Sequence, residues 1–476
     1  MRYVRYTLIV LFAICSSVNA QEKWDLRKIV DYAMTNNITV KQSEVQASVS
    51  QLVYNQSKLA LFPNVSFSGN EGFYSGRNQD PTTYRLITQS YWSAGMQLQT
   101  SADIFNFYSK KNLILSNQWE LEAAKANTNK LKNDIALTAA NGYLQVLLAI
   151  EQENIARVQL RQTQAQLSNT RKLVNAGSLP ELNAAELEAQ EARDSANYVS
   201  AKGNVTQTIL VLKSYMNFDA AAPFDVSVPP IELIPIEKIA DLQPEAVFAL
   251  ALANQPLQKF NNYKLKAAEK ASQVYRGNMY PNFFLFGNLG SGYNSRAEQI
   301  TGSRPVISPI GKVSVSGVDY SVLPITPFVD FSYGSVGVTK QFEQNFRQSV
   351  GIGVSVPIFN GAQARTNWQR SKLNIRTIEL QQEADNQKVK QDIYQAYNAA
   401  LVALEKFNAS SKSVSASQRT LDFAQKRYDV GMLGTFELIT NQNNLFRAKL
   451  EYVLNQYDYV FKMKVLEFYK GQGLRL

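Results

Sequence analysis

The sequence predicts a mainly α-helical chain with a smaller β component, built from one architectural unit that occurs twice. Two stretches of about 70 residues without proline, Phe107–Ala176 and Ala362–Val430, are typical of very long helices, and such a helix extends for about 100 Å. The tripeptide Ile-Phe-Asn precedes both stretches, and a glycine, Gly177 or Gly431, follows each of them. Each pair of landmarks is 254 residues apart. A repeat on this scale constrains the fold more than any short motif, and helices so long indicate a structure that spans a distance.

Residues 1–20 have the three parts of a secretory signal peptide. Arg2 and Arg5 supply the positive charge, Tyr6–Ile14 supplies the apolar segment, and a Val-Asn-Ala cleavage site ends at Ala20. The apolar segment is far shorter than the roughly 20 residues that a transmembrane helix needs. We therefore expect the chain to be exported and the leader to be removed.

The composition argues against several functional classes. Cys15 is the only cysteine, and Ile14 precedes it where a lipoprotein acylation site needs a small residue, so we expect a mature chain without cysteine. The chain has no histidine, which removes the commonest general base and metal ligand. The net charge is +10, or +8 without the leader, and its basic residues are scattered rather than gathered in a nucleic-acid patch. We expect no enzyme, no cofactor, no metal and no nucleic-acid partner.

The first repeat is expected to occupy residues 21–218. A short helical segment over about Leu26–Leu59 stops before Pro63, where strands begin. The long helix follows these strands and ends at Gly177. A return helix over Glu181–Asn217 completes the repeat.

The second repeat is expected to occupy residues 244–476 in the same order. Its short helical segment, Pro244–Gly277, is broken or kinked at Pro256. Strands begin after Pro281, and the return helix covers Thr435–Gly471.

The proline-rich residues 219–243 link the two repeats. Two short helices of about 35 residues placed end to end match one long helix, so a layer of uniform height would place this linker at mid-height. A simple intramolecular bundle is the commoner arrangement of long helices. The narrow stripes of small residues in segments such as Asn408–Ser417 instead favour helices that face water on two sides.

The β segments have the alternation of membrane strands. Within Ser349–Val356, every second residue is a β-branched aliphatic and the others are only Ser or Gly. This pattern is typical of outer-membrane strands, although soluble half-buried strands also alternate. If the small residues line a lumen, arginine should be milder at Gly353 than on the aliphatic face. We expect four side chains of this strand to face membrane lipid: Val350, Ile352, Val354 and Val356.

The number of strands predicts that several chains assemble. Each repeat supplies two strands, whereas membrane barrels begin at about eight strands and lipid tolerates no open sheet edge. The second β segment exceeds the first by 36 residues, mostly within residues 295–330. This insert is rich in Ser, Gly and Pro, which indicates an extended loop at the cell surface.

The turns after the two long helices carry the most specific motifs. The first turn contains Gly177 and is followed by the pair Ala189-Gln190. The second has Tyr428 three residues before Gly431, with an acid and a glutamine beyond it. Glycine at the C′ position lets a helix end in the left-handed conformation. Together with the doubled helix–strand–strand–helix plan, these motifs resemble the outer-membrane efflux protein family, the TolC-like channels, over essentially the whole mature chain.

The resemblance implies a homotrimer that forms a 12-stranded β-barrel in outer-membrane lipid, continued by a long α-helical barrel in the periplasm. Such a channel serves as the export duct of a tripartite efflux or secretion system. It works with an inner-membrane pump and a periplasmic adaptor protein that docks at the helix tips. Four residues of this chain correspond to that docking region: Gly177, Gly431, Ala189 and Gln190.

The resemblance also implies a periplasmic entrance with acidic residues and a gating tyrosine. Glu437 stands six residues after the second tip glycine, Tyr428 stands three before it, and Glu186 follows the first tip. Three other positions depart from the family pattern at the closed gate: Leu433, Thr440 and Asn183. An alternative interpretation is that Glu437 and Glu186 only stabilise helix N-termini through the helix dipole.

Two other classes of protein remain open from the sequence. One is a structural or adhesive coiled-coil stalk on the cell surface, and the other is an adaptor with a helical hairpin. Neither contains membrane strands, so the alternation within Ser349–Val356 argues against both. Dependence of the purified chain on detergent would distinguish them from a channel.

Overall fold

The computed structural model describes residues 23–80, 84–228 and 234–471. The predicted leader, with Cys15, lies outside the described residues. The chain divides into two compact units. The helical unit consists of residues 23–54, 116–269 and 373–471, and the sheet unit consists of residues 55–115 and 270–372, without residues 81–83. No helix among the described residues combines the length and the apolar character needed to cross a membrane.

The helices of the first repeat agree with the expected order, with one additional break. Their bounds are α2 (Leu26–Asn36), α3 (Ile38–Leu59), α4 (Ser109–Asn175) and α5 (Glu181–Met216). The break lies at Asn37, whose ψ angle is 133°. Its side-chain amide donates to the Tyr215 carbonyl oxygen at 2.8 Å, and its side-chain oxygen accepts from the Thr39 amide at 2.9 Å. Asn37 thus caps α3 and ties it to α5, which the sequence pattern did not reveal.

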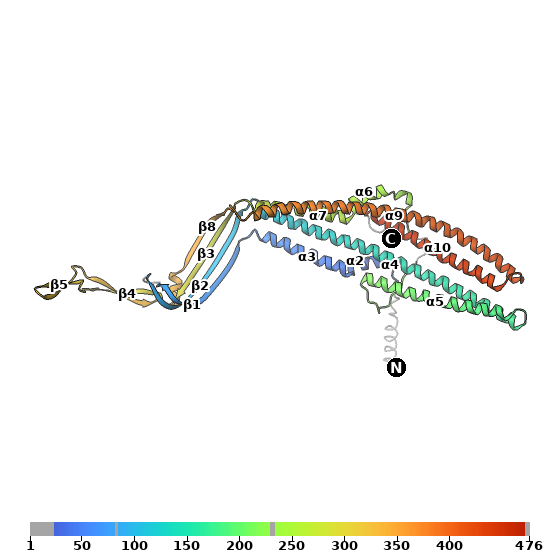
Figure 1. Ribbon diagram of the computed structural model, residues 1–476, viewed down its shortest axis with the longest axis horizontal. Helices are drawn as coiled ribbons and strands as arrows, with labels where there is room; N and C mark the ends of the chain where they lie inside the picture. The colour runs from blue at the N-terminus through green and yellow to red at the C-terminus, as the bar shows by residue number, and fades with distance from the viewer. Residues whose placement is uncertain (1–22, 81–83, 229–233, 472–476) are drawn as a thin grey trace, which may run out of the picture. The chain divides into compact units, whose positions relative to one another are not determined.

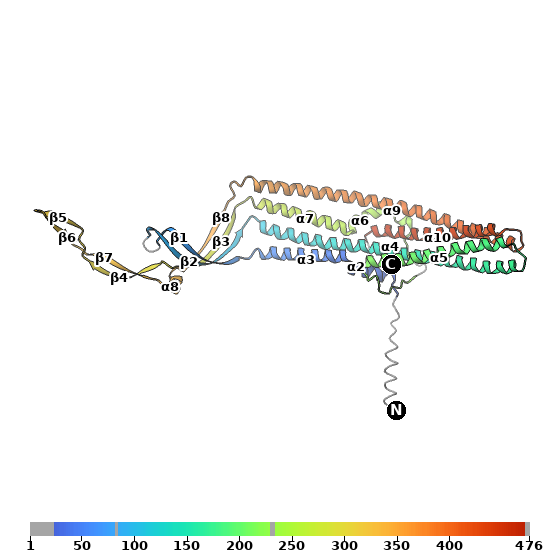
Figure 2. The ribbon, with the colours of Figure 1, turned by 60° about the horizontal axis from the view of Figure 1, so that its bottom comes forward.

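The helices of the second repeat begin and end close to the expected positions. Their bounds are α6 (Pro244–Asn254), α7 (Pro256–Gly277), α9 (Gln363–Asp429) and α10 (Thr435–Tyr469). The expected interruption at Pro256 is confirmed, because proline begins α7 and lacks the amide that a continuous helix would need. Figure 2 shows the long helices α4 and α9 running alongside the return helices α5 and α10.

The core of the helical unit forms where α4 meets α2, α5 and the linker. Tyr143 and Leu147 of α4 are buried with Leu212 of α5. Gly142 permits the close approach, since a Cβ atom there would lie 3.2 Å from Leu212 Cδ1. The Tyr143 hydroxyl donates to the Ser227 carbonyl oxygen at 2.8 Å. Burial raises the pKa of Tyr143 to about 12, which keeps this donor protonated.

The linker between the repeats is held to both return helices by buried charged groups. At the end of α5, Lys213 donates to the carbonyl oxygens of Ala220 and Ala222. At the end of α10, Glu467 accepts from the Glu237 amide at 2.7 Å and pairs with buried Lys464 at 2.8 Å. The linker also contains a short 3₁₀ helix, η2 (Ile239–Asp241). These contacts fix an irregular segment that has few regular backbone bonds of its own.

The main sheet contains four antiparallel strands in the order β1-β2-β3-β8 (Figure 1). Their bounds are β1 (Asn64–Gln79), β2 (Leu86–Phe105), β3 (Asn282–Asn294) and β8 (Arg347–Ser355). The first repeat supplies β1 and β2 and the second supplies β3 and β8, which confirms two sheet strands per repeat. In the described chain, the outer edges of β1 and β8 have no further strand partner.

The insert between β3 and β8 is not the extended loop that its composition suggested. It forms two antiparallel ladders, in which β4 pairs with β7 and β5 pairs with β6. The bounds are β4 (Glu298–Val306), β5 (Gly311–Val315), β6 (Val318–Val322), β7 (Phe328–Ser335) and the short helix α8 (Val338–Gln344). The Ser, Gly and Pro residues lie among alternating valines and aromatics, so overall composition concealed a strand pattern.

Candidate functional site

Both long helices end in the same backbone motif at the helix tips. At the first tip, Gly177 has φ of 73°, its amide donates to the Val174 carbonyl at 2.8 Å, and the Ser178 amide donates to the Leu173 carbonyl at 2.9 Å. This pair of bonds defines a Schellman motif. The left-handed glycine expected from the sequence is confirmed here.

The second tip repeats the motif around Gly431. Its φ is 73°, its amide donates to the Tyr428 carbonyl at 2.9 Å, and the Met432 amide donates to the Arg427 carbonyl at 2.8 Å. Helix α10 then starts at Thr435. The two tips therefore share one geometry, as the repeat predicts.

Tyr428 lies in a small apolar cluster at the second tip. Its ring packs against Ala424, Leu433 and Leu438. Its hydroxyl oxygen is buried and has no hydrogen-bond partner among the described residues. Leu433, one of the positions that depart from the family pattern at the gate, is only 8% exposed and belongs to this cluster. The tip thus closes on itself through apolar packing.

The two acids expected at the entrance, Glu437 and Glu186, are more accessible to solvent than Leu433 of the tip cluster. Glu437 is exposed on the first turn of α10, and Thr440 one turn later is also exposed. Glu186 and Asn183 on α5 are half-buried. The structure thus places acidic side chains beside both tips, within helix first turns or one turn beyond.

A cleft of about 830 Å³ lies between the two helix tips. Its lining comes from both hairpins and combines leucines with polar side chains, which include Gln166, Asn169 and Asn183 from the first and Gln425, Tyr428 and Gln442 from the second. The Gln442 side-chain amide donates to the Gln166 side-chain oxygen at 2.7 Å across it. The remaining polar atoms of this pair, Gln166 Nε2 and Gln442 Oε1, are buried and have no hydrogen-bond partner in the described chain.

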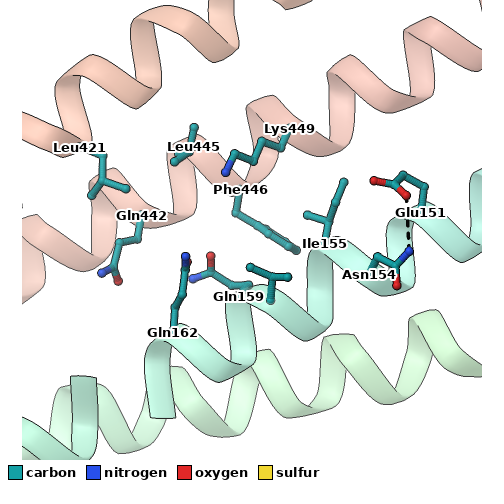
Figure 3. A pocket seen from close by; sticks show the side chains of 11 residues that line it. Glu151, Asn154, Ile155, Gln159, Gln162, Leu421, Gln442, Leu445, Phe446 and Lys449 are labelled. Atoms are coloured by element: carbon teal, nitrogen blue, oxygen red, sulfur yellow. Dashed lines mark hydrogen bonds between the residues drawn. The ribbon is translucent and has the colours of Figure 1, made fainter. Parts of the chain in front are cut away.

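A smaller cavity of about 200 Å³ shares part of this lining (Figure 3). In the figure, Phe446 of α10 extends toward Ile155 of α4. Gln162 and Gln442 line both hollows. The α4, α9 and α10 helices are thus incompletely packed against one another over this stretch, with amide side chains in the gaps.

Gln190 does not lie on an exposed docking surface of this chain. It is 3% exposed, and its amide nitrogen donates to Asp194 Oδ1 at 2.8 Å and Asn443 Oδ1 at 3.1 Å. Arg193 donates to its oxygen at 2.9 Å, and Thr163 donates to Asp194 Oδ2 at 2.7 Å. This polar network joins α4, α5 and α10. The neighbouring Ala189 is exposed, as are both tip glycines.

The sequence alone did not indicate this network or the Gln166–Gln442 pair. Each partner belongs to a different helix, and the distance along the chain is 31 residues for Thr163 and Asp194 but 253 for Gln190 and Asn443. A surplus of Gln and Asn at buried helix positions was the available signal. This surplus identifies particular hydrogen-bonded pairs only when the register between the helices is known.

The sheet has one apolar face and one polar face. The expected membrane residues of β8 are exposed, with Val350 at 78%, and Val356 lies one residue beyond the strand. The apolar face continues across the other strands through Phe67, Leu98 and Leu285. The opposite face carries two polar pairs, Ser68 with Gln97 and Asn288 with Ser349. It also carries the rings of Phe284 and Phe286 from β3. The exposed apolar face thus consists of aliphatic and aromatic side chains from all four strands.

The face of β8 that carries Gly351 and Gly353 is covered by side chains, whereas the sequence predicted that Gly353 would face an open lumen. A Cβ atom at Gly353 would lie 2.3 Å from Phe284 Cζ, and one at Gly351 would lie 2.7 Å from Phe286 Cζ. Both rings belong to the neighbouring strand β3 and lie over these glycines. An arginine at Gly353 must therefore displace a ring, so the milder effect expected there is not supported. Ser349 is an exposed alternative on the same face.

The described residues contain no group of three or more acidic, cysteine or histidine side chains that could hold a metal ion.

A model of the outer membrane efflux protein family matches residues 29–217 and 248–471. The outer membrane protein TolC of Escherichia coli (strain K12) is 22% identical over 441 residues, which cover 92% of this chain and 80% of that protein.

Two solved structures share the fold over most of the chain. The CusC structure has a TM-score of 0.74 at 15% identity and covers 96% of both chains. The CmeC outer membrane channel of Campylobacter jejuni has a TM-score of 0.74 at 16% identity, over 94% of this chain and 86% of that one. With the family match spanning both repeats, the chain belongs to the outer membrane efflux protein family, which confirms the predicted family and the predicted location in the outer membrane with a periplasmic part.

Proposed function

We propose that this protein is a trimeric export duct of a tripartite efflux or secretion system. In this proposal, three copies close a 12-stranded β-barrel in the outer membrane and a long α-helical barrel in the periplasm. Cargo passes from an inner-membrane pump and a periplasmic adaptor to the exterior. The chain itself performs no catalysis in this function.

The observation that carries the proposal is the four-stranded sheet of the sheet unit. Its apolar face is exposed, and the outer edges of β1 and β8 are unpaired in the described chain. Lipid cannot satisfy the backbone groups of such edges. Joining β1 of one copy to β8 of the next satisfies them, and three copies supply twelve strands. Twelve lies within the range of known membrane barrels.

The proposed periplasmic entrance lies at the helix tips. Glu437 is exposed beside the second tip, and Glu186 is half-buried beside the first. Tyr428 packs within the apolar cluster of the second tip. We propose that the acids attract cations to the entrance and that Tyr428 holds the tip closed. The adaptor is proposed to dock near Gly177, Gly431 and Ala189, since Gln190 is buried.

Single-channel recording in planar bilayers tests both the duct and its entrance. Wild-type protein should conduct and should prefer cations, because three copies of an exposed acid around a narrow pore concentrate negative potential. Glu437→Gln should reduce that preference, and Tyr428→Ala should raise conductance by loosening the closed tip.

Glu405→Gln provides the matched control. It neutralises an exposed acid of α9 outside the tips and should leave cation preference at the wild-type value. Absence of any conductance in the wild type would contradict the duct. Wild-type behaviour of both tip variants would leave the duct standing but place the gate elsewhere.

A further inference from the structure

The hairpin formed by β5 and β6 has one apolar and one polar face. The register pairs Val313 with Tyr320 and Val315 with Val318. The alternate pairs are Lys312 with Ser321 and Ser314 with Asp319. The apolar side chains are largely uncovered in the described chain, with Val318 at 53% and Tyr320 at 56% exposure.

The hairpin has the geometry of a specific turn rather than of a loop. Its two central residues, Ser316 and Gly317, have φ of 54° and 84°. Two positive φ angles are typical of the primed turns that match the twist of paired strands. The register of the two faces is thereby fixed, because a slip of one residue would exchange them.

The base of the insert is tied to the main sheet by Gln341 of α8. Gln341 is 3% exposed, and its side chain exchanges two hydrogen bonds with the backbone of Asn294, at 2.9 and 3.0 Å. It also donates to the Val336 carbonyl oxygen at 2.8 Å. These bonds connect the end of β3 with the end of β7 and so anchor the base of the insert to the main sheet.

The apolar face needs a cover, and neither water nor lipid provides it. A lone two-stranded hairpin is marginally stable in water at best. In hydrocarbon, unpaired strand edges are too costly, and the outer edges of β5 and β6 have no partner in the described chain. A protein surface remains as the cover.

Other copies of this chain are the protein surface that the proposed function supplies. In a trimer, β3 and β8 of every copy lead into one insert, so three inserts leave the barrel at the same end. Between Glu298 and Ser335 each copy carries two basic and three acidic residues, a net charge of −1, so repulsion between copies is small. We propose that the apolar faces of the three β5–β6 hairpins pack against one another and join the copies beyond the barrel.

Single cysteines on the two faces test this packing. The background is Cys15→Ser, which removes the only native cysteine, and the variants are Val318→Cys on the apolar face and Ser321→Cys on the polar face. Purified protein in detergent is treated with a flexible bismaleimide and then denatured. We expect Val318→Cys to yield dimer-sized chains as the main product and Ser321→Cys to remain monomer-sized.

Light scattering of the same samples separates this inference from the proposed function. Trimers in which Val318→Cys fails to cross-link, or in which both variants cross-link equally, overturn the hairpin packing alone. Absence of trimers in the wild type overturns the proposed duct together with the packing. As a second readout, Val318→Asp should lower the temperature at which trimers dissociate, whereas Ser321→Asp should leave it unchanged.

Discussion

At the scale of single residues, Gln190 occupies a buried position that its sequence context did not indicate. Its side chain connects Asp194 and Arg193 on its own helix with Asn443 on α10. Replacement by leucine removes a donor to a buried carboxylate and leaves polar groups without partners. We expect Gln190→Leu to lower the free energy of unfolding by about 1–3 kcal/mol, measured from the loss of helical circular dichroism on heating.

Ala189→Ser is the control for this substitution. Ala189 is the exposed neighbour on the same helix, and changes at such surface positions usually stay within about 0.5 kcal/mol. Equal melting of the leucine variant and the wild type would show that the network adds no net stability.

Gly353 and Phe284 form a second residue-scale pair, across neighbouring strands. A methyl group at Gly353 overlaps the Phe284 ring, and overpacking of this kind costs about 1–3 kcal/mol. We expect Gly353→Ala to destabilise the assembled protein in the wild-type background and to be nearly neutral in a Phe284→Ala background. A double-mutant cycle on the thermal midpoint measures this coupling. Gly311→Ala, with no atom within 4 Å of the added Cβ, is the control, and independent effects at both sites would contradict the steric argument.

Residue-level prediction from the sequence succeeded where the determinant was local. The conformations of Gly177 and Gly431 depend only on the ends of their own helices, and both glycines adopt the expected left-handed conformation. The partner of Gln190 and the ring above Gly353 depend on register between helices and between strands. Such register is set by packing of the whole unit, so it was not available from residue spacing.

At the scale of elements, proline and glycine determined what the sequence could predict. The predicted long helix Phe107–Ala176 is observed as Ser109–Asn175, because these landmarks act on their own backbone. The break at Asn37 was missed, since its cause is a bond to the Tyr215 carbonyl across the unit. The ladders of the insert were missed because their valines alternate within a segment rich in loop-forming residues.

The tip glycines give a prediction at the scale of elements. No atom lies within 4 Å of a Cβ added at Gly177 or Gly431, so alanine there is opposed only by the backbone. A left-handed conformation costs an L-residue roughly 1–2 kcal/mol, and we expect Gly177→Ala and Gly431→Ala to lower the thermal midpoint.

Gly203→Ala is the matched control for the tips and should act in the opposite direction. Gly203 lies inside α5, is exposed and also has open space around its Cβ position. Alanine is favoured over glycine there by roughly 0.5–1 kcal/mol, so this variant should raise the midpoint. A fall in all three variants would mean that factors other than backbone conformation dominate.

At the scale of the whole molecule, the proposed assembly rests on the backbone groups that a single chain leaves unsatisfied. Counting two sheet strands per repeat was possible from the sequence, and the structure has the same four strands in one sheet. Their order and register came only from the structure. In the proposed trimer, the edges of β1 and β8 that are unpaired in the described chain join between copies, and the exposed face around Ile352 contacts lipid.

The last prediction concerns this assembly. The described chain leaves one sheet edge open at β1 and one at β8, so the proposed contact between copies is head-to-tail, and such contacts form rings when the rotation closes. We expect the mature chain in detergent to have the mass of three copies by light scattering. Arginine at Ile352 on the apolar face should reduce the yield of trimers in membranes, at about 2–4 kcal/mol near the bilayer midplane. Ser349→Arg on the polar face should assemble normally. A stable monomer in detergent would contradict the barrel, and equal yields from the two arginine variants would show that β8 does not face lipid.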